Sequence, residues 1–220
     1  MMKTKKLTIK VNADIGSVSA ECVMPGGPLA MLVLAHGAGA GMNHSFMTSM
    51  AKLLADRDIA TLRYNFPFME AGKGRPDSPA VAHATIAAAI TRGISLAGSV
   101  PLFAGGKSFG GRMSSQYIAE HPLTAIGGLV FFGFPLHPAG KPSVDRADHL
   151  KKIQFPMLFL QGTRDALAEW KLIQKVCRPL KSATLARIEN ADHSFKAGKT
   201  DVHAILADTC REWIEKQIKR

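Results

Sequence analysis

Cysteine is scarce in this sequence. Only three are present, and Cys22, Cys177 and Cys210 are far apart along the chain. An odd number at wide spacing suits neither a disulfide framework nor a C-x-x-C metal site. We therefore expect free, mostly buried thiols, and nothing in the sequence implies a metal or an organic cofactor.

Long apolar runs are also missing. No stretch approaches the roughly 20 consecutive apolar residues that a membrane helix requires. The N-terminal MMKTKKLTIKV contains lysines, but polar and apolar residues alternate after them, whereas a secretory signal has an unbroken apolar stretch. These features predict a soluble, cytoplasmic protein without a membrane segment.

Acidic residues are few, with 17 Asp and Glu against 28 Lys and Arg, a net charge of +11. Such a charge raises encounter rates with acidic substrates, nucleic acid or anionic surfaces. The basic residues are dispersed, however, and two Trp and two Tyr provide few rings for base stacking. We expect a small-molecule partner and no specific nucleic acid. A basic nucleic-acid module is an alternative, recognisable by a steep fall of affinity with salt. The sequence does not indicate an oligomeric state.

The stretch AGGKSFGGR, residues 104–112, fits two kinds of site. Gly-Lys-Ser suits a phosphate-binding loop, whereas Gly-Lys-Ser-Phe-Gly is a G-x-S-x-G, typical of a serine nucleophile. A P-loop needs a further glycine five residues before Gly106, where the chain has Pro101. Proline has no backbone N–H and a fixed φ, so it cannot play that part. The pattern therefore favours the serine.

Short apolar runs alternate with segments of helical periodicity, a rhythm typical of βαβ units around a mostly parallel sheet. A length of 220 residues, 46% apolar and 20% charged, predicts one α/β domain over residues 1–220 with helices on both faces. The predicted strands are 5–11 and 17–24, as an antiparallel edge, then 29–35, 59–64, 101–104, 126–134, 157–161 and 183–188. The predicted helices are 45–57, 79–97, 109–120, 166–177 and 201–219, with a Gly/Pro-rich loop at 66–79.

Ser108 lies between a predicted strand and a predicted helix. Small neighbours such as Gly106 and Gly110 allow a sharp turn there, which lifts the serine hydroxyl away from the sheet. G-x-S-x-G alone is a modest signal, because a glycine-rich helix start capped by serine has the same pattern. Its place between strand and helix favours the nucleophile.

A serine hydroxyl needs a base within hydrogen-bonding reach, and that base needs an orienting acid. In a strand–serine–helix arrangement of this kind the three follow in the order Ser, Asp or Glu, His. Asp165 follows the strand at 157–161, and His193 follows the last strand. Both are predicted to lie at the same edge of the sheet as Ser108.

Each of these residues has rivals. Asp145 and Asp148 lie farther from a strand end, Glu169 is predicted inside a helix, and Asp192 abuts His193 too closely to orient its ring. An isolated Asp after a strand is more often a turn or N-cap residue. Four histidines are predicted at helix surfaces or in packing, and three in loops that could line the site: His83, His121, His149 and His203, then His36, His44 and His137.

The tetrahedral intermediate of acyl transfer needs fixed backbone donors for its oxyanion. The glycine-rich AHGAGAGMNH, residues 35–44, follows a buried strand and lets N–H groups approach closely. We expect the amides of Ala38 and Phe109 to be these donors. A glycine-rich turn without a ligand is the alternative.

Four segments, RYNFPFMEAGKGRPD, GGKSFGGRM, FPLHPAGKP and FLQGTRD, resemble the α/β-hydrolase superfamily, and the likeness runs from about Leu29 to the C-terminal helix. The compact length resembles cap-less, dienelactone-hydrolase-like members, although those named for dienelactone use cysteine where this chain has Ser108. The segments are most similar to a subgroup of small serine-type proteins of undefined substrate. The resemblance implies an α/β-hydrolase fold with Ser108 as nucleophile, Asp165 as acid and His193 as base.

Together these features predict a serine hydrolase that cleaves an ester, thioester or similar acyl bond. A non-catalytic scaffold with the same fold is the alternative, since some relatives serve as non-enzymatic parts of complexes. The roles of four charged residues stay open, with solvated or capping roles favoured: Glu70, Arg75, Lys107 and Arg112. Core packing is favoured over a pocket wall for Met47, Phe66, Phe68, Met69 and Phe134. The connection from Leu136 to Gln154 is too short for a helical cap.

Overall fold

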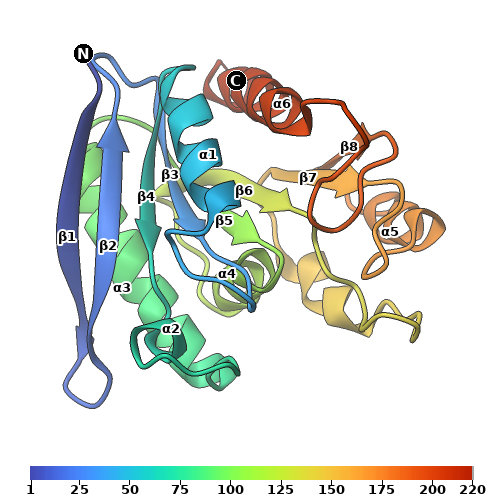
Figure 1. The fold of residues 1–220 in the computed structure, drawn as a ribbon, viewed down its shortest axis with the longest axis horizontal. Coiled ribbons are helices and arrows are strands. Elements are labelled where there is room, and N and C mark those ends of the chain that lie inside the picture. The colour runs from blue at the N-terminus through green and yellow to red at the C-terminus, as the bar shows by residue number, and fades with distance from the viewer. Residues whose placement is uncertain (220) are drawn as a thin grey trace.

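The computed structural model describes residues 1–219, which build an eight-stranded sheet in the order β1-β2-β4-β3-β5-β6-β7-β8 (Figure 1). The strands are β1 Lys3–Asn12, β2 Gly16–Met24, β3 Ala30–Ala35, β4 Ile59–Tyr64, β5 Leu102–Lys107, β6 Ile126–Phe132, β7 Met157–Gly162 and β8 Ala183–Ile188. From β4 to β8 across the sheet every pair is parallel. The mostly parallel sheet predicted from the sequence is confirmed.

The antiparallel edge predicted at the N-terminus is confirmed as well. Strands β1 and β2 form a hairpin, and β2 pairs antiparallel with β4. In the turn, the side chain of Asn12 accepts a hydrogen bond from the N–H of Ile15 at 2.8 Å. The chain then enters β3, whose six residues are all buried, as expected of a central strand covered on both faces.

Helices cover both faces of the sheet. Helices α1 (Ser45–Ala55) and α6 (Val202–Ile218) contact each other and share one apolar core with the sheet. Helices α3 (Pro79–Ala97), α4 (Phe109–Glu120) and α5 (Trp170–Cys177) belong to the core of the opposite face (Figure 1). Both cores consist of apolar side chains from the sheet and from one helix layer, which is the arrangement expected of βαβ units.

Several predicted boundaries are wrong. The predicted helix 166–177 begins only at Trp170, because residues 165–168 form hydrogen-bonded turns, such as Ala168 N–H to the carbonyl of Asp165 at 3.2 Å. The loop at 66–79 contains a one-turn helix, α2 (Pro67–Glu70), and the connection after β6 contains a 3₁₀ helix, η1 (Asp145–Lys152). Strand β5 reaches Lys107, three residues beyond the predicted end, and therefore runs up to Ser108.

Helix α3 is long and apolar enough to cross a membrane by length and composition alone, which differs from the prediction that no segment is. In this structure α3 contacts β1, β3 and α4 and buries one face against them. Its buried residues include Ala82, Ile86 and Ile90. Packing on the sheet therefore accounts for its apolar composition.

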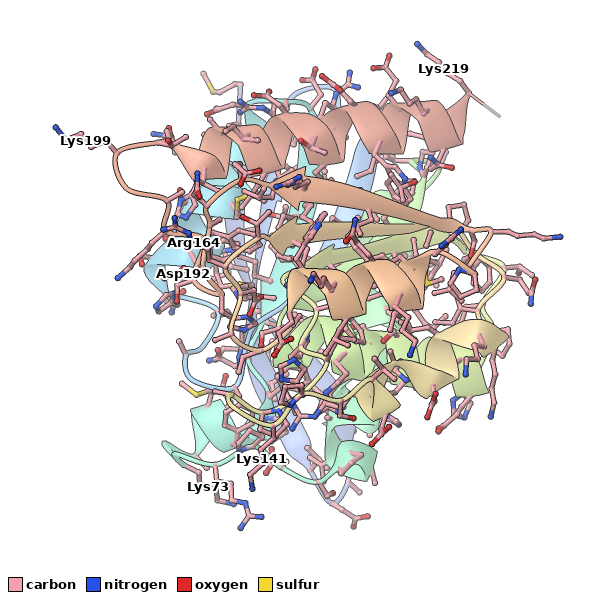
Figure 2. All side chains as sticks on the ribbon, turned by 90° about the vertical axis from the view of Figure 1, so that its right-hand side faces the viewer. Lys73, Lys141, Arg164, Asp192, Lys199 and Lys219 are labelled. Atoms are coloured by element: carbon pink, nitrogen blue, oxygen red, sulfur yellow. The ribbon has the colours of Figure 1, made fainter. Side chains whose placement is uncertain are left out.

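The positive charge is spread over the molecule. Figure 2 shows labelled lysines at widely separated places: Lys199 and Lys219 at opposite ends of the top, and Lys73 and Lys141 at the bottom. The exposed ion pairs, such as Arg57 with Asp208 at 2.6 Å, use only part of the basic surplus. This distribution agrees with the dispersed charge seen in the sequence.

Candidate active site

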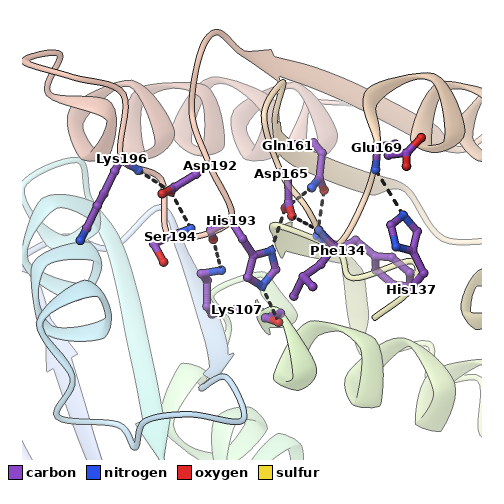
Figure 3. Close-up of polar contacts among 12 residues, drawn as sticks. Lys107, Phe134, His137, Gln161, Asp165, Glu169, Asp192, His193, Ser194 and Lys196 are labelled. Atoms are coloured by element: carbon purple, nitrogen blue, oxygen red, sulfur yellow. Dashed lines mark hydrogen bonds and ion pairs between the residues drawn. The ribbon is translucent and has the colours of Figure 1, made fainter. Parts of the chain in front are cut away.

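The structure brings Ser108, Asp165 and His193 together at one edge of the sheet. Figure 3 shows the ring of His193 next to Asp165. Ser108 follows β5, Asp165 follows β7 and His193 follows β8. These strands are parallel, so their carboxyl ends point the same way and their following loops meet. The predicted convergence of the three side chains is therefore present in the geometry.

Ser108 occupies a sharp turn with φ 50° and ψ −115°, a conformation that side chains seldom adopt. Its N–H donates to the carbonyl of Phe132 at 3.1 Å, which fixes the turn against β6. Glycines flank it because neighbouring backbone lies very close. A Cβ on Gly106 would collide with the carbonyl of Ala35, and one on Gly110 with the carbonyl of His36.

His193 forms a hydrogen bond on each side of its ring. Nδ1 lies 2.7 Å from Oδ2 of Asp165, and Nε2 lies 2.8 Å from Oγ of Ser108. A carboxylate can only accept, so Nδ1 carries the proton and Nε2 accepts from the serine hydroxyl. The side chain of Asp165 is 1% exposed and that of His193 is 22% exposed. The acid is thus shielded while the base reaches the surface.

Asp165 is held by two further hydrogen bonds. Its Oδ1 accepts from the N–H of Leu167 at 2.8 Å, and its Oδ2 accepts from Nε2 of Gln161 at 2.6 Å. Gln161 is fully buried at the end of β7, and its Oε1 accepts from the N–H of Phe134 at 2.9 Å. The sequence interpretation missed Gln161. Its place four residues before Asp165, on a strand buried on both sides, was the signal that could have identified it.

The rival carboxylates lie elsewhere. Asp145 and Asp148 are in η1. Asp192 accepts from the N–H groups of Ser194 and Lys196 at 2.8 and 2.9 Å, so it organises its own loop. Glu169 was predicted inside a helix, but it is the N-cap residue of α5.

The loop after β3 faces Ser108. A Cβ on Gly37 would lie 3.8 Å from Cβ of Ser108, which places the next residue, Ala38, beside the serine. The buried ring of His36 ties this loop to the segment that follows β4. Its Nδ1 is 2.7 Å from the carbonyl of Gly37, and its Nε2 accepts a hydrogen bond from the N–H of Phe66 at 2.9 Å. Burial lowers the pKa of His36 to about 4, so the ring is neutral at pH 7.

A cavity of about 380 Å³ opens over the serine. Its wall combines the Gly37–Ala40 loop, the start of α1, Leu167 and the His193 loop. Core packing was favoured for Met47, Phe66, Phe68 and Phe134, and all four are buried in the core. Met47 also lines the cavity. Of the three loop histidines only His44 lines the cavity. His36 and His137 are buried. Among the described residues the connection from Leu136 to Gln154 contributes nothing to this wall.

Lys107 differs from its predicted solvated or capping role. It is partly buried in the cavity wall, and its Nζ donates to the carbonyl of His193 at 2.6 Å. Of the other three charged residues, Arg75 is exposed, and Glu70 is exposed but accepts from the N–H of Ser19 at 2.8 Å. Arg112 is half-buried, with its Nε lacking an acceptor in the described part of the chain.

The cysteines take no part in this site, since Cys22, Cys177 and Cys210 are buried and unpaired. Within residues 1–219 no group of three or more His, Cys, Asp or Glu side chains could hold a metal ion. The side chains that meet at this site are a hydroxyl, an imidazole and a carboxylate in line, beside backbone N–H groups.

Comparison with known proteins agrees with this fold. Residues 28–217 match the family model described as an alpha/beta hydrolase domain. The structure is similar to a dienelactone hydrolase from Anabaena variabilis, with a TM-score of 0.77 and 18% identity over 98% of each chain.

Two further solved structures are similar. One is an esterase domain of a Rhodothermus marinus protein, with a TM-score of 0.73 and 16% identity over 97% of this chain and 98% of that one. The other is an α/β serine hydrolase without lid from Xanthomonas campestris, with a TM-score of 0.73 and 20% identity over 96% of this chain and 95% of that one. Identities this low establish a common fold, so the activity must be argued from the site.

Proposed function

The chain belongs to the alpha/beta hydrolase family, and from this membership we propose that it is a serine hydrolase acting on an ester, thioester or similar acyl bond. The predicted α/β-hydrolase fold is confirmed by the sheet and by the structural relatives. The observation that carries the proposal is the position of His193, whose ring is within hydrogen-bonding distance of both Ser108 and Asp165. That arrangement is what a serine needs to act as a nucleophile at neutral pH.

In the proposed mechanism, Nε2 of His193 takes the proton of Ser108 as its Oγ attacks the acyl carbon. Asp165 stabilises the imidazolium that forms, and the imidazolium then protonates the leaving group. An acyl-enzyme remains on Ser108. Water, deprotonated by His193, attacks this ester and releases the acid, and the serine recovers its proton.

The oxyanion of each tetrahedral intermediate would lie between the N–H groups of Ala38 and Phe109. Phe109 is the first residue of α4, so its N–H has no acceptor within the helix and joins the positive end of the helix dipole. The N–H of Ala38 belongs to the loop that His36 holds beside Ser108. Removing a donor of this kind typically costs about 10²–10³ in kcat.

The backbone of Ser108 argues against the scaffold alternative. A positive φ at a residue with a side chain costs of order 1–3 kcal/mol, and such strain clusters at functional sites. A protein that only binds partners gains nothing from a strained serine or from a buried Asp165 aligned behind His193. An open cavity above the serine fits a small acyl substrate.

One continuous sheet runs through the described residues, which supports a single domain over residues 1–220. A cytoplasmic location and a mechanism without cofactor are proposed on the sequence features given above.

A panel of nitrophenyl esters and acyl thioesters tests the proposal. Wild-type protein should hydrolyse at least one of them, while Ser108→Ala and His193→Ala should lose at least a thousandfold in kcat/KM. Ser194→Ala removes a different hydroxyl from the same cavity wall and should keep at least a tenth of the activity. Equal turnover by Ser108→Ala and wild type would overturn the assignment.

A further inference from the structure

Lys107 links the serine turn to the loop that carries His193. It is the last residue of β5 and immediately precedes Ser108. Its Nζ donates to the backbone carbonyl of His193 at 2.6 Å (Figure 3). It also lies 5.8 and 5.3 Å from the ring centroids of Phe46 and Phe195. The side chain of Lys107 thus contacts helix α1 through Phe46, and it contacts the His193 loop at two places, the carbonyl of His193 and the ring of Phe195.

The His193 loop has few other ties to the fold. Within residues 192–196 the hydrogen bonds of the backbone are internal: the N–H of Asp192 donates to the carbonyl of Lys196, and two loop N–H groups donate to the carboxylate of Asp192. In the described part of the chain, the bond from Lys107 is the one hydrogen bond from outside to this backbone. Without it, the position of the His193 backbone depends on the packing of Phe195 and on the imidazole itself.

The ammonium has no carboxylate in direct contact among the described residues. Burial lowers the pKa of Lys107 to about 8. The negative charges of Asp165 and Asp192 raise this pKa, but their effect is smaller than that of burial. The group is still mainly protonated at neutral pH, so its bond to the carbonyl is charge-assisted. The faces of Phe46 and Phe195 offer further attraction to the cation. A partly buried cation is costly to retain, and two of its three contacts, with the carbonyl of His193 and the ring of Phe195, are with the His193 loop.

We propose that Lys107 is a positioning residue for the hydrolase reaction: it holds the backbone of His193 at a fixed place relative to the adjacent Ser108. This inference rests on the proposed function. Lys107 and Ser108 share a peptide bond, so the base is anchored directly to the segment that carries the nucleophile. Displacement of a reacting group by about 1 Å can cost about 100-fold in rate, which makes such an anchor effective.

Lys107→Met tests the proposal, because methionine keeps much of the apolar stem and removes both donor and charge. Lys196→Met is the matched control, since it makes the same change at an exposed position of the same loop. We expect Lys107→Met to lower kcat about 10- to 100-fold with KM within threefold of wild type. Lys196→Met should keep both constants within threefold. Lys107→Gln, too short to reach the carbonyl, replaces the methionine variant if that one does not fold.

A spectroscopic readout keeps this test separate from the proposed function. The proton on Nδ1 of His193, bonded to Asp165, should give a far-downfield NMR signal that is missing in His193→Ala. We expect Lys107→Met to weaken or broaden this signal while circular dichroism stays unchanged, and Lys196→Met to retain it. This comparison can be made even if no tested ester is hydrolysed.

Loss of the signal in Lys107→Met alone supports the positioning role, whether or not turnover is found. An unchanged signal together with unchanged labelling by a fluorophosphonate would overturn it. Absence of labelling and turnover in the wild type, with the signal still sensitive to Lys107→Met, would remove the proposed function and leave the structural link intact.

Discussion

Nε2 of His193 lies 2.8 Å from Oγ of Ser108, although 85 positions separate the two residues in the chain. The parallel arrangement of β5 to β8 brings them together, because it places the ends of these strands at one edge. The contact joins a strained turn that exposes a hydroxyl to a loop that supplies a base. The chemistry proposed for the protein depends on this contact.

Asp165→Asn should lower kcat by about 10³–10⁴. It should also cost about 1–3 kcal/mol of stability, because the amide that faces Nδ1 of His193 also faces the Nε2 donor of Gln161. The amide can donate to Nδ1 of His193, and this favours the tautomer with the proton on Nε2, which cannot accept the proton of Ser108. Steady-state kinetics on an ester substrate, with thermal unfolding as the check on folding, measures the effect.

Asp192→Asn is the control for that change, since it alters the neighbouring carboxylate. Asp192 caps N–H groups in its own loop, so we expect at most a tenfold fall in kcat. A larger loss in Asp192→Asn than in Asp165→Asn would show that the acid had been assigned to the wrong residue.

Gln161→Met should destabilise the protein by about 1–3 kcal/mol, because the buried N–H of Phe134 loses its acceptor. It should also lower kcat, since Oδ2 of Asp165 loses a donor at 2.6 Å. Urea unfolding and kinetics measure both effects. Gln154→Met, at an exposed position, is the control. Wild-type stability and kcat in Gln161→Met would contradict this role.

Gly133→Ala and Gly140→Ala form a matched pair, since both glycines have φ 71°. Each substitution should cost about 1–2 kcal/mol of stability through backbone strain. At Gly133 the new Cβ would lie 3.3 Å from Nζ of Lys107 and 3.6 Å from Cε1 of His193, whereas at Gly140 it meets nothing within 4 Å. We expect kcat to fall only in Gly133→Ala, and equal kcat in both variants would refute the crowding argument.

His36 should make the fold sensitive to acid. Its pKa is lowered from 6.5 to about 4 by burial, so the unfolded chain binds this proton more readily than the folded one. The stability it contributes is complete above pH 6.5 and is lost as the pH falls toward 4. Between pH 7 and pH 5 this amounts to about 2 kcal/mol.

Urea unfolding at both pH values measures this loss. His36→Gln should be less stable than wild type at pH 7, where the loop loses its ring contacts, but should lose about 2 kcal/mol less on going to pH 5. His121→Gln, at an exposed position, should behave as wild type. Identical pH dependence in His36→Gln and wild type would rule out His36 as the acid-sensitive group.

The sequence was sufficient to predict where the main parts of the site lie. Buried strands give continuous apolar runs, and the residues that follow them lie at the edge where parallel strands end. This is why Ser108, Asp165 and His193 could be placed together without coordinates. The turn at Ser108 was also predictable, because Gly106 and Gly110 permit the close backbone approach that it needs.

Side-chain direction was not predictable in the same way. Lys107 next to a glycine-rich turn resembles a solvated residue, and only the packing of α1 and the His193 loop reveals that it points inward. Gln161 is one polar residue in an apolar strand, and its two partners come from separate loops. The late start of α5 has a local cause, since Asp165 accepts from the N–H of Leu167 and holds the chain in a turn.

The most direct test of the account is the site of covalent modification by a fluorophosphonate, determined by peptide mass spectrometry. The hydroxyl activated by His193 should react, so we expect one adduct per chain, on the peptide that contains Ser108. The adduct should persist in Ser194→Ala and be absent from Ser108→Ala and His193→Ala. Failure to modify the folded wild-type protein, or an adduct on a residue other than Ser108, would contradict the proposed nucleophile.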